Sequence, residues 1–493
     1  MHLANELLHE LDTPGLSLSE RTLLRCRLAK LQEQAGDYNA ASEALAGFWL
    51  GVGERPNLER LDDESQAHVL LRVGSLTGWI GSIRQIEGSQ EAAKDLISES
   101  VRIFEQLGRQ KNVAEARSDL ALCYWRAGAH DEARVILKEA LEEFEQSDQE
   151  QRATTLLRLA EAERSSGRLS EALRIYKQVG PLIDDLNDHL LAGHYHDSFA
   201  NVLNQLSSVE RRNDYVDLAL IEYAAASFHF EQAGHEVYQA CVENNLGLLF
   251  STIRKFENAH EHLDRAQMLM TRRKDNVHLA QVDETRARVL LAEGRLVQAE
   301  KTAHSAVLTL EKGEESTFLA EALITHGIAL TQLHRSKQAR TALERAISIA
   351  EQSGDSENAG LAALTLIEHL GETLTNDERR DALIHANLLV ETTEDIGILR
   401  RATLVAFRML FSMPPKWKEF SFRRAVTQYE SYLIKLALTE TNGSVSKASR
   451  LLGFKHHQSL ISMLNTRHRD LIEIRSKAKK RRHHLIDHSQ LRK

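Results

Sequence analysis

Apolar residues recur along most of the chain at intervals of three and four positions, the spacing of one face of an α-helix. A longer motif overlies this periodicity: an apolar–small pair, a glycine seven residues later, an alanine five residues beyond it, then more apolar and small residues. The clearest copy runs through Leu120-Ala121, Gly128, Ala133, Leu137 and Ala140. The glycine suits the end of one helix, and the small residues let the next helix approach closely. Each copy therefore predicts two antiparallel helices.

The alanine that follows the glycine measures the period of the repeat. Copies fall at Ala41, Ala93, Ala133, Ala172, Ala219, Ala259, Ala299, Ala339 and Ala382. From Ala219 to Ala339 the steps are 40 residues each, and elsewhere they vary, which indicates loops of different length. One pair of helices cannot bury its apolar side alone, so the pairs are expected to stack into a superhelical solenoid. This predicts about nine helical pairs over residues 1–413.

The turns between the helices carry their own signals. The turn glycines, expected in the left-handed conformation, are Gly36, Gly88, Gly128, Gly167 and Gly294. Polar residues that follow some of these glycines are expected to cap the second helix of a pair, namely Asp37, Ser89 and Ser170.

This constellation resembles the tetratricopeptide repeat superfamily, as in Leu246-Gly247, Phe250, Ala259, Leu263 and Ala266. The resemblance covers roughly residues 20–395. The period is longer than the family's usual value of about 34 residues, and the proline that usually ends a repeat is missing, which implies longer helices or linkers. The resemblance implies a superhelix whose concave groove accepts a peptide or a helix. An irregular or HEAT-like α-solenoid is the alternative and would change the curvature but not the class.

Composition supports an all-α fold. The 493 residues include only 5 prolines and 25 glycines, with 5% aromatic and 27% charged residues. Such a chain lacks the branched and aromatic residues that β-sheets favour, so an all-β or doubly wound fold is excluded as improbable.

Charge divides the chain into two regions. The formal net charge of −9 argues against a nucleic-acid partner when taken alone. After Pro414-Pro415, however, residues 416–493 hold 18 Lys and Arg against 6 Asp and Glu, a net charge of +12, which leaves −21 on the rest. An acidic solenoid favours a basic or amphipathic segment in its groove, and the chain's own basic end is one candidate. The prolines indicate a domain boundary.

The region that follows has the pattern of three short helices. A helix is predicted over 422–441, Asn442-Gly443 ends it, Ser444 can cap a second helix over 445–452, and a third runs over about 456–465. Gly453 supplies the tight turn between the last two helices. This order predicts a helix-turn-helix domain over 416–470.

The run from Leu433 to Phe454, with Asn442-Gly443, Ala448 and Leu452-Gly453, resembles the Fis-type DNA-binding domain that also ends many bacterial enhancer-binding regulators. The resemblance covers about 45 residues, Glu419 to Asn465. Leu460 comes one position later than is usual in the family, and His456-His457-Gln458 replaces its usual basic residues. The expected small core consists of Val445, Ala448, Leu452, Phe454, Leu460, Ile461 and Leu464.

Double-stranded DNA is the partner that this domain implies. The side chains expected to face the major groove, where Gln can pair with an adenine edge, are Lys455, His456, His457, Gln458, Ser459 and Ser462. Those expected near phosphates, where they add affinity but no sequence choice, are Lys447, Arg450, Arg467, His468 and Arg469. The alternative is a helical pair that merely closes the solenoid.

Residues 471–493 are predicted to form a basic, flexible tail. Its cations are Lys477, Lys479, Lys480, Arg481 and Arg482. The tail would follow a phosphate backbone or a minor groove and add salt-dependent affinity. A solvated tail of little function is the alternative.

No motif for catalysis, a cofactor or a metal is found. Phosphate-binding loops, nucleophile elbows and zinc-protease motifs are missing, so we expect no enzymatic activity. The pairs His194/His196 and His260/His262 point about 200° apart on a helix and cannot share a metal. Cys26, Cys123 and Cys241 fit no disulfide or metal pattern and are expected to be buried apolar residues. No signal peptide or membrane-spanning stretch is visible, which predicts a cytoplasmic protein.

Together these features predict a bacterial DNA-binding transcriptional regulator. Its solenoid would be a sensor or protein-docking arm, and its terminal domain would bind DNA as a homodimer, since one recognition helix covers only half a site. The alternative is a non-catalytic interaction scaffold whose terminal module binds protein or RNA.

Overall fold

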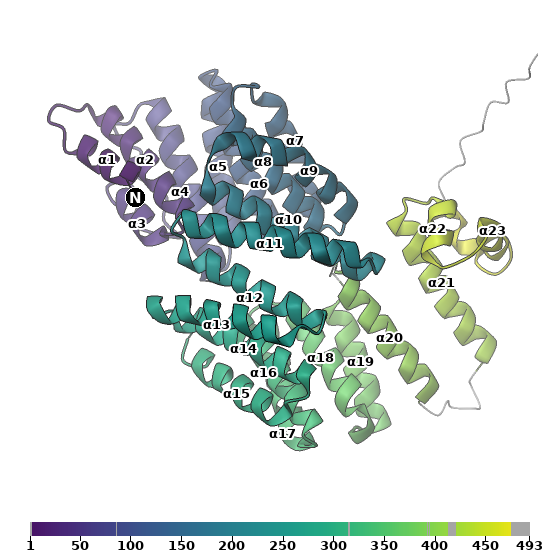
Figure 1. The fold of residues 1–493 in the computed structure, drawn as a ribbon. Helices are drawn as coiled ribbons and strands as arrows, with labels where there is room; N and C mark the ends of the chain where they lie inside the picture. The colour runs from purple at the N-terminus through teal and green to yellow at the C-terminus, as the bar shows by residue number, and fades with distance from the viewer. Residues whose placement is uncertain are drawn as a thin grey trace, which may run out of the picture. The chain divides into compact units, whose positions relative to one another are not determined.

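The computed structural model describes residues 2–84, 86–313, 316–391, 393, 395–412 and 421–474. The chain divides into two compact units, Met1–Arg408 and Met409–Lys493. Every regular element within the described residues is a helix (Figure 1), which confirms the all-α class. The boundary expected at Pro414-Pro415 lies outside the described residues.

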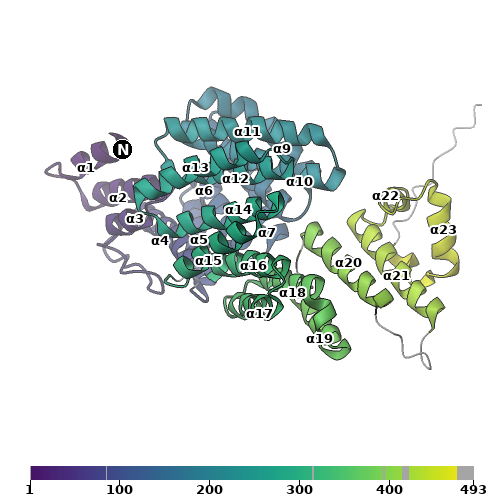
Figure 2. The same ribbon diagram turned by 60° about the horizontal axis from the view of Figure 1, so that its bottom comes forward.

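The first unit is a succession of antiparallel helical pairs, seen from two sides in Figure 1 and Figure 2. The first helices of the pairs are α2 (Leu18–Gln34), α4 (Asp63–Ile83), α6 (Gln110–Arg126), α8 (Gln149–Ser165), α10 (His189–Glu210), α12 (Glu236–Thr252), α14 (Asn276–Glu293), α16 (Ser316–Gln332) and α18 (Ser356–Leu370). The second helices are α3 (Tyr38–Ala44), α5 (Ser89–Gln106), α7 (His130–Glu143), α9 (Leu169–Leu186), α11 (Asn213–Gln232), α13 (Phe256–Arg273), α15 (Leu296–Leu310), α17 (Ser336–Gln352) and α19 (Asn376–Leu389). Helix α1 (His2–Leu11) precedes the pairs, and η1 (Gly371–Thr373) and α20 (Ile396–Ser412) belong to the last part of the array.

The first helices also contact one another in succession, from α2 to α10 and again from α12 to α18. This second set of contacts makes the array a solenoid rather than a row of isolated hairpins. We refer to α2, α4, α6, α8, α10, α12, α14, α16 and α18 as the inner helices.

The small residues of the motif lie where the helices of a pair approach most closely. The motif alanines from Ala41 to Ala339 are 0% exposed, and Ala382 packs at the edge of the core. Gly247 on α12 shows how close the approach is, because a Cβ there would lie 2.7 Å from Cγ of Leu263 on α13. Small residues at these positions therefore set the distance between the helices.

The turn glycines adopt the expected backbone, with φ between 70° and 83°. Asp37 caps α3 as expected, since its carboxylate accepts a hydrogen bond from the Ala40 amide at 2.9 Å. The prediction for the two serines was wrong. Ser89 is the first residue of α5, whose N-cap is Gly88, and the N-cap of α9 is Arg168 rather than Ser170. Glycine and arginine occupy these caps without a side-chain bond, so packing rather than capping determines where these helices start.

The second unit holds α21 (Phe422–Glu440), α22 (Val445–Leu451), α23 (His457–Thr466) and η2 (Arg469–Ile474). These bounds agree with the predicted helices to within one residue. Asn442, Gly443 and Gly453 have φ of 49°, 74° and 73°, which gives the two tight turns. Ser444 occupies the N-cap position of α22, but its side chain makes no capping hydrogen bond.

Candidate functional sites

A buried core holds α22 and α23 against α21 in the second unit. Its buried residues include the expected Val445, Ala448, Leu460 and Leu464, joined by Ile434, Ala437, Leu438 and Leu471. The expected core residues Leu452, Phe454 and Ile461 are only partly buried at its edge. Because Leu460 and Leu464 face this core, with Ile461 and Met463 at its edge, the opposite face of α23 is left to solvent.

The ten residues expected to bind DNA are all exposed. They are Lys447, Arg450, Lys455, His456, His457, Gln458, Ser459, Ser462, Arg467 and Arg469. The structure thus places a cation-rich, hydrogen-bonding surface on α22, on the turn that follows and on α23. Within the described ranges, Lys447, Arg450 and Lys455 form no ion pair.

The residues after α23 differ from expectation at one position. His468 is 1% exposed, and its Nε2 lies 3.1 Å from a carboxylate oxygen of Glu430 on α21. It therefore helps to fix the end of α23 and is not free to contact a phosphate. Arg467 pairs with the same carboxylate at 3.3 Å, and Arg469 donates to the Asn465 carbonyl at 2.9 Å.

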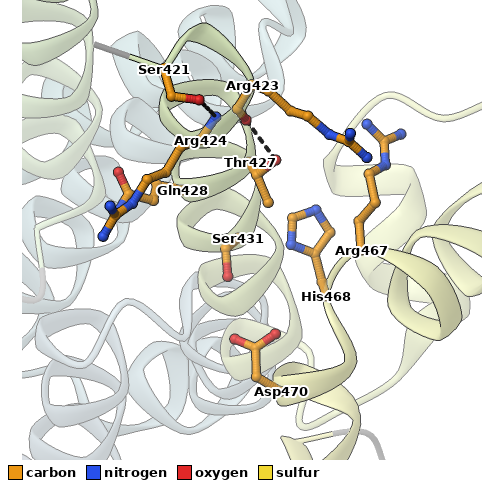
Figure 3. A pocket seen from close by; sticks show the side chains of 9 residues that line it. All are labelled: Ser421, Arg423, Arg424, Thr427, Gln428, Ser431, Arg467, His468 and Asp470. Atoms are coloured by element: carbon orange, nitrogen blue, oxygen red, sulfur yellow. Dashed lines mark hydrogen bonds between the residues drawn. The ribbon is translucent and has the colours of Figure 1, made fainter. Parts of the chain in front are cut away.

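A pocket that the sequence did not reveal lies between the start of α21 and the residues after α23 (Figure 3). Its volume is about 430 Å³. Its lining consists of Ser421, Arg423, Arg424, Thr427, Gln428, Ser431, Arg467, His468 and Asp470. Three arginines and one carboxylate give it a positive character. Neighbouring arginines at 423 and 424 were a signal in the sequence, but nothing local showed that Arg467 would join them.

The predicted basic tail, with Lys477, Lys479, Lys480, Arg481 and Arg482, lies outside the described residues. Its contacts therefore remain a prediction.

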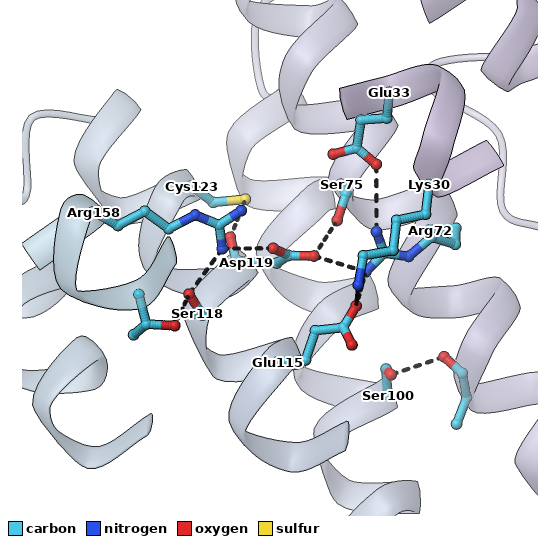
Figure 4. A network of polar contacts seen from close by, with 12 residues as sticks. Lys30, Glu33, Arg72, Ser75, Ser100, Glu115, Ser118, Asp119, Cys123 and Arg158 are labelled. Carbon is cyan, nitrogen blue, oxygen red and sulfur yellow. Dashed lines mark hydrogen bonds and ion pairs between the residues drawn. The ribbon is translucent and has the colours of Figure 1, made fainter. Parts of the chain in front are cut away.

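The inner helices of the solenoid carry a second polar site, an ion network around Arg72 of α4 (Figure 4). Arg72 pairs with Asp119 of α6 at 2.8 Å, with Glu115 of α6 at 3.1 Å and with Glu33 of α2 at 3.4 Å. Lys30 of α2 reaches Glu115 at 2.8 Å, across the intervening α4. Side chains from α2 and α6 can meet over α4 only because the inner helices form the concave side of the array.

Burial and charge act in opposite directions in this network. Burial raises the pKa of Glu33 to about 7, although Arg72 acts to lower it. Burial also opposes the charge of Asp119, but Arg158 at 2.7 Å and Arg72 together lower the pKa of that carboxyl. Asp119 is therefore the ionised centre of the network, shared by arginines from α4 and α8, and it ties three inner helices together.

The concave side also holds space and unsatisfied polar atoms. A hollow of about 70 Å³ lies beside the ion network, lined by side chains of α2, α4, α6 and α8 together with Phe144. Further along, Oδ1 of Asp197 on α10 and Oδ1 of Asn244 on α12 are buried without a hydrogen-bond partner among the described residues. Burial raises the pKa of Asp197 to about 6. These two oxygens therefore keep hydrogen-bonding capacity that the described residues do not use.

The sixth helical pair contacts the end of the first inner helix, α2. Nε2 of His235, just before α12, lies 3.2 Å from the Ala35 carbonyl oxygen at the end of α2, and Nδ1 accepts from the Tyr238 amide at 3.3 Å. This pattern requires a neutral ring with its proton on Nε2. Burial lowers the pKa of His235, which favours that neutral form. The inner side of the first five pairs therefore lies within one closed turn.

The paired histidines diverge, as predicted. His194 packs edge-on against Tyr238, with ring centroids 4.6 Å apart, whereas His196 bonds Glu222 at 2.6 Å. In the second pair, His260 bonds Glu293 at 3.1 Å and His262 bonds Glu243 at 2.7 Å.

All three cysteines are free thiols, with Cys26 and Cys123 buried and Cys241 partly so. None of the helices in the described ranges combines the length and apolar character needed to cross a bilayer.

Comparison with known proteins identifies the repeats. Residues 72–146, from within α4 to just past α7, match the family model described as tetratricopeptide repeat. The chain thus contains tetratricopeptide repeats, as the resemblance implied. No curated protein matches the chain in sequence.

Similar solved structures include the apo form of RapI, at 13% identity and a TM-score of 0.49 over 80% of this chain and 100% of RapI. Yeast Tom70 shows 14% identity and a TM-score of 0.47 over 85% of this chain and 88% of that one. The apo quorum sensor NprR from B. thuringiensis shows 13% identity and a TM-score of 0.42 over 79% and 92%. At these identities the likenesses concern the path of the backbone alone.

Proposed function

We propose that the chain is a non-catalytic transcriptional regulator that binds double-stranded DNA through its second unit and a peptide or protein segment on the concave side of its solenoid. The exposure of all ten predicted residues of α22, α23 and their flanks, above a closed apolar core, is the observation that carries the DNA proposal. A protein surface that leaves cations unpaired is suited to phosphates, and adjacent amides and hydroxyls are suited to base edges.

Within this proposal, α23 enters the major groove. Gln458 and Ser459 lie in its first turn, where side chains reach base edges, and Lys447 and Arg450 of α22 contact the flanking backbone. One such helix reads half a site, so the regulator acts as a homodimer on a palindromic site.

The DNA proposal is tested by selection of bound duplexes from a random-sequence pool with the full chain. Wild type should retain duplexes in a salt-dependent way and enrich palindromes. Gln458→Ala should relax the enrichment at one base position, by about 1–3 kcal/mol of discrimination, and leave the salt dependence unchanged. Gln232→Ala, an exposed glutamine at the end of α11, is the matched control. Failure of wild type to retain any duplex would refute the proposal.

The docking proposal rests on the concave side, where Oδ1 of Asp197 and Oδ1 of Asn244 have no hydrogen-bond partner among the described residues. An extended peptide offers backbone amides at regular intervals and is suited to such acceptors. Peptides selected from a random display library on the full chain should bind Asn244→Ala about tenfold more weakly, as expected for a buried hydrogen bond worth about 1.5 kcal/mol. Asn258→Ala on the exposed side of α13 should bind them as wild type does.

The second candidate is an interaction scaffold, which the tetratricopeptide match over residues 72–146 favours on its own. It predicts that the second unit retains single-stranded RNA or protein instead of duplex DNA. The selection repeated with single-stranded RNA of the same sequence in place of the duplex distinguishes the two candidates: the scaffold should retain the RNA, and the regulator should retain the duplex.

A further inference from the structure

The pocket in the second unit brings like charges together. Figure 3 shows the side chains of Arg423 and Arg467 pointing toward one another from opposite walls, one from α21 and one from the end of α23. Two guanidinium groups repel unless an anion lies between them. Arg467 pairs with Glu430, whereas Arg423 and Arg424 form no ion pair within the described residues, so no carboxylate of that range neutralises these two arginines.

Arg467 is held in place by a carboxylate of α21. Glu430 accepts from both Arg467 and His468, at 3.3 and 3.1 Å, and His468 is fully enclosed. This carboxylate holds Nη1 of the Arg467 guanidinium, and Figure 3 shows that guanidinium beside the one of Arg423. Arg467 is thereby oriented before any ligand arrives.

The pocket also has the donors that a phosphoryl group needs. Ser431 lines the pocket from α21, Gln428 lies on the other side of that helix in Figure 3, and Asp470 is the one carboxylate among the nine lining residues. Arginine is well matched to phosphate because its planar fork donates two parallel hydrogen bonds. The volume of about 430 Å³ is ample for a single phosphodiester group.

We infer that this pocket holds a phosphodiester of the DNA backbone between Arg423 and Arg467. The inference rests on the proposed DNA-binding function and extends it to a contact that the helix-turn-helix pattern does not include. Helix α23 has 10 residues, so it is about 15 Å long. The major groove is about 12 Å wide. With the first turn of α23 at the bases, a pocket at its other end is within reach of a phosphate on the groove wall.

The test is the salt dependence of duplex binding by the full chain, measured by fluorescence anisotropy with a random-sequence duplex. Losing one phosphate contact should make the slope of log K against log salt less negative by about 0.9, which is about fivefold weaker binding at 0.15 M salt. Arg423→Gln and Arg467→Gln should each show this change. Because both hold the same phosphate, the double variant should lose no further slope.

Two variants control for charge and folding. Arg423→Lys keeps the cation and should retain the wild-type slope. Lys435→Gln removes an exposed cation from the same helix outside the pocket and should leave the slope unchanged. Thermal unfolding of all variants should match wild type, because the altered side chains are exposed.

The outcomes separate the inference from the function on which it rests. If wild type binds no duplex, the proposed function is wrong. If wild type binds and Arg423→Gln keeps its slope, only the inference is wrong. The pocket could instead bind free phosphate, which is tested by titrating inorganic phosphate into the DNA-free protein by calorimetry. If Arg423→Gln abolishes saturable phosphate binding but leaves the salt slope of DNA binding unchanged, the pocket binds a free anion and the inference is overturned.

Discussion

Arginines have opposite surroundings in the two units of this protein. In the solenoid, Arg72 is 4% exposed and lies among carboxylates from α2 and α6. In the second unit, Arg450 is exposed and forms no ion pair within the described residues. A buried cation surrounded by carboxylates contributes to the fold, whereas a cation left in solvent is free for a partner. The local surroundings of a charge, rather than the net charge of a unit, therefore indicate its role.

The largest effect is expected when the solenoid loses its central cation. Arg72→Met removes the one cation that forms an ion pair with Glu33 among the described residues, while Glu115 keeps Lys30 and Asp119 keeps Arg158. We expect a loss of about 3–5 kcal/mol in the free energy of unfolding, measured by urea denaturation. The loss should be greater at pH 8 than at pH 5.5, since Arg72 lowers the pKa of Glu33 and an ionised Glu33 would then lack a partner.

The control for this variant is a cation of the same type at the surface. Arg55 pairs with Glu99, but its side chain is 66% exposed. Arg55→Met should change the free energy of unfolding by less than about 1 kcal/mol. Equal effects for the two variants would contradict the role given to burial.

A smaller effect, of about 3 kcal/mol, is expected from the partly buried imidazole of His194, which packs against Phe230 and Tyr238. Burial lowers its pKa to about 4, whereas an unfolded histidine titrates near about 6.5. Between these values the unfolded chain binds the additional proton, so the stability that the neutral ring provides is lost as pH falls from 6.5 toward 4. Wild type should therefore lose up to about 3 kcal/mol relative to His194→Gln over this range, followed by urea denaturation. A difference that does not vary with pH would contradict the lowered pKa of this ring.

The sequence predicted the structure correctly where interactions between residues close in the sequence determine it. Alanines recurring at a fixed period predicted the helical pairs, because only small residues fit where two neighbouring helices approach, as at Gly247. The ion network could not be predicted, because Arg72, Asp119 and Arg158 meet only through the curvature of the stacked helices.

In the second unit, too, the sequence predicted local features but not contacts between residues distant in the sequence. Leu460 and Leu464 revealed which face of α23 is buried, and so which residues are exposed. His468 was misplaced, because the periodicity of α23 ends before it and Glu430 lies on a distant helix. The arginine pocket was missed for the same reason.

A third test asks whether close packing stabilises the solenoid as strongly as its buried charges do. A Cβ at Gly247 would lie 2.7 Å from Cγ of Leu263 and 3.2 Å from the Ala259 carbonyl oxygen. Gly247→Ala should therefore cost about 1–3 kcal/mol through overpacking, visible as a lower unfolding midpoint. Gly313→Ala, whose nearest atom would be 3.7 Å away, should be within about 0.5 kcal/mol of wild type. Equal stability of the two variants would mean that α12 and α13 can move apart.

The smallest effect on stability, and the sharpest contrast with Arg72, is expected for the exposed cations of α22. Lys447→Gln with Arg450→Gln removes two charges that contact no carboxylate among the described residues, so the free energy of unfolding should change by less than about 0.5 kcal/mol. Duplex binding by the full chain should nevertheless weaken, with a salt slope less negative by about 1.8 for two lost phosphate contacts. Urea denaturation and fluorescence anisotropy on the same preparation measure both quantities. A large loss of stability with unchanged binding would mean that these exposed cations support the fold. The contrast with the buried Arg72 would then disappear.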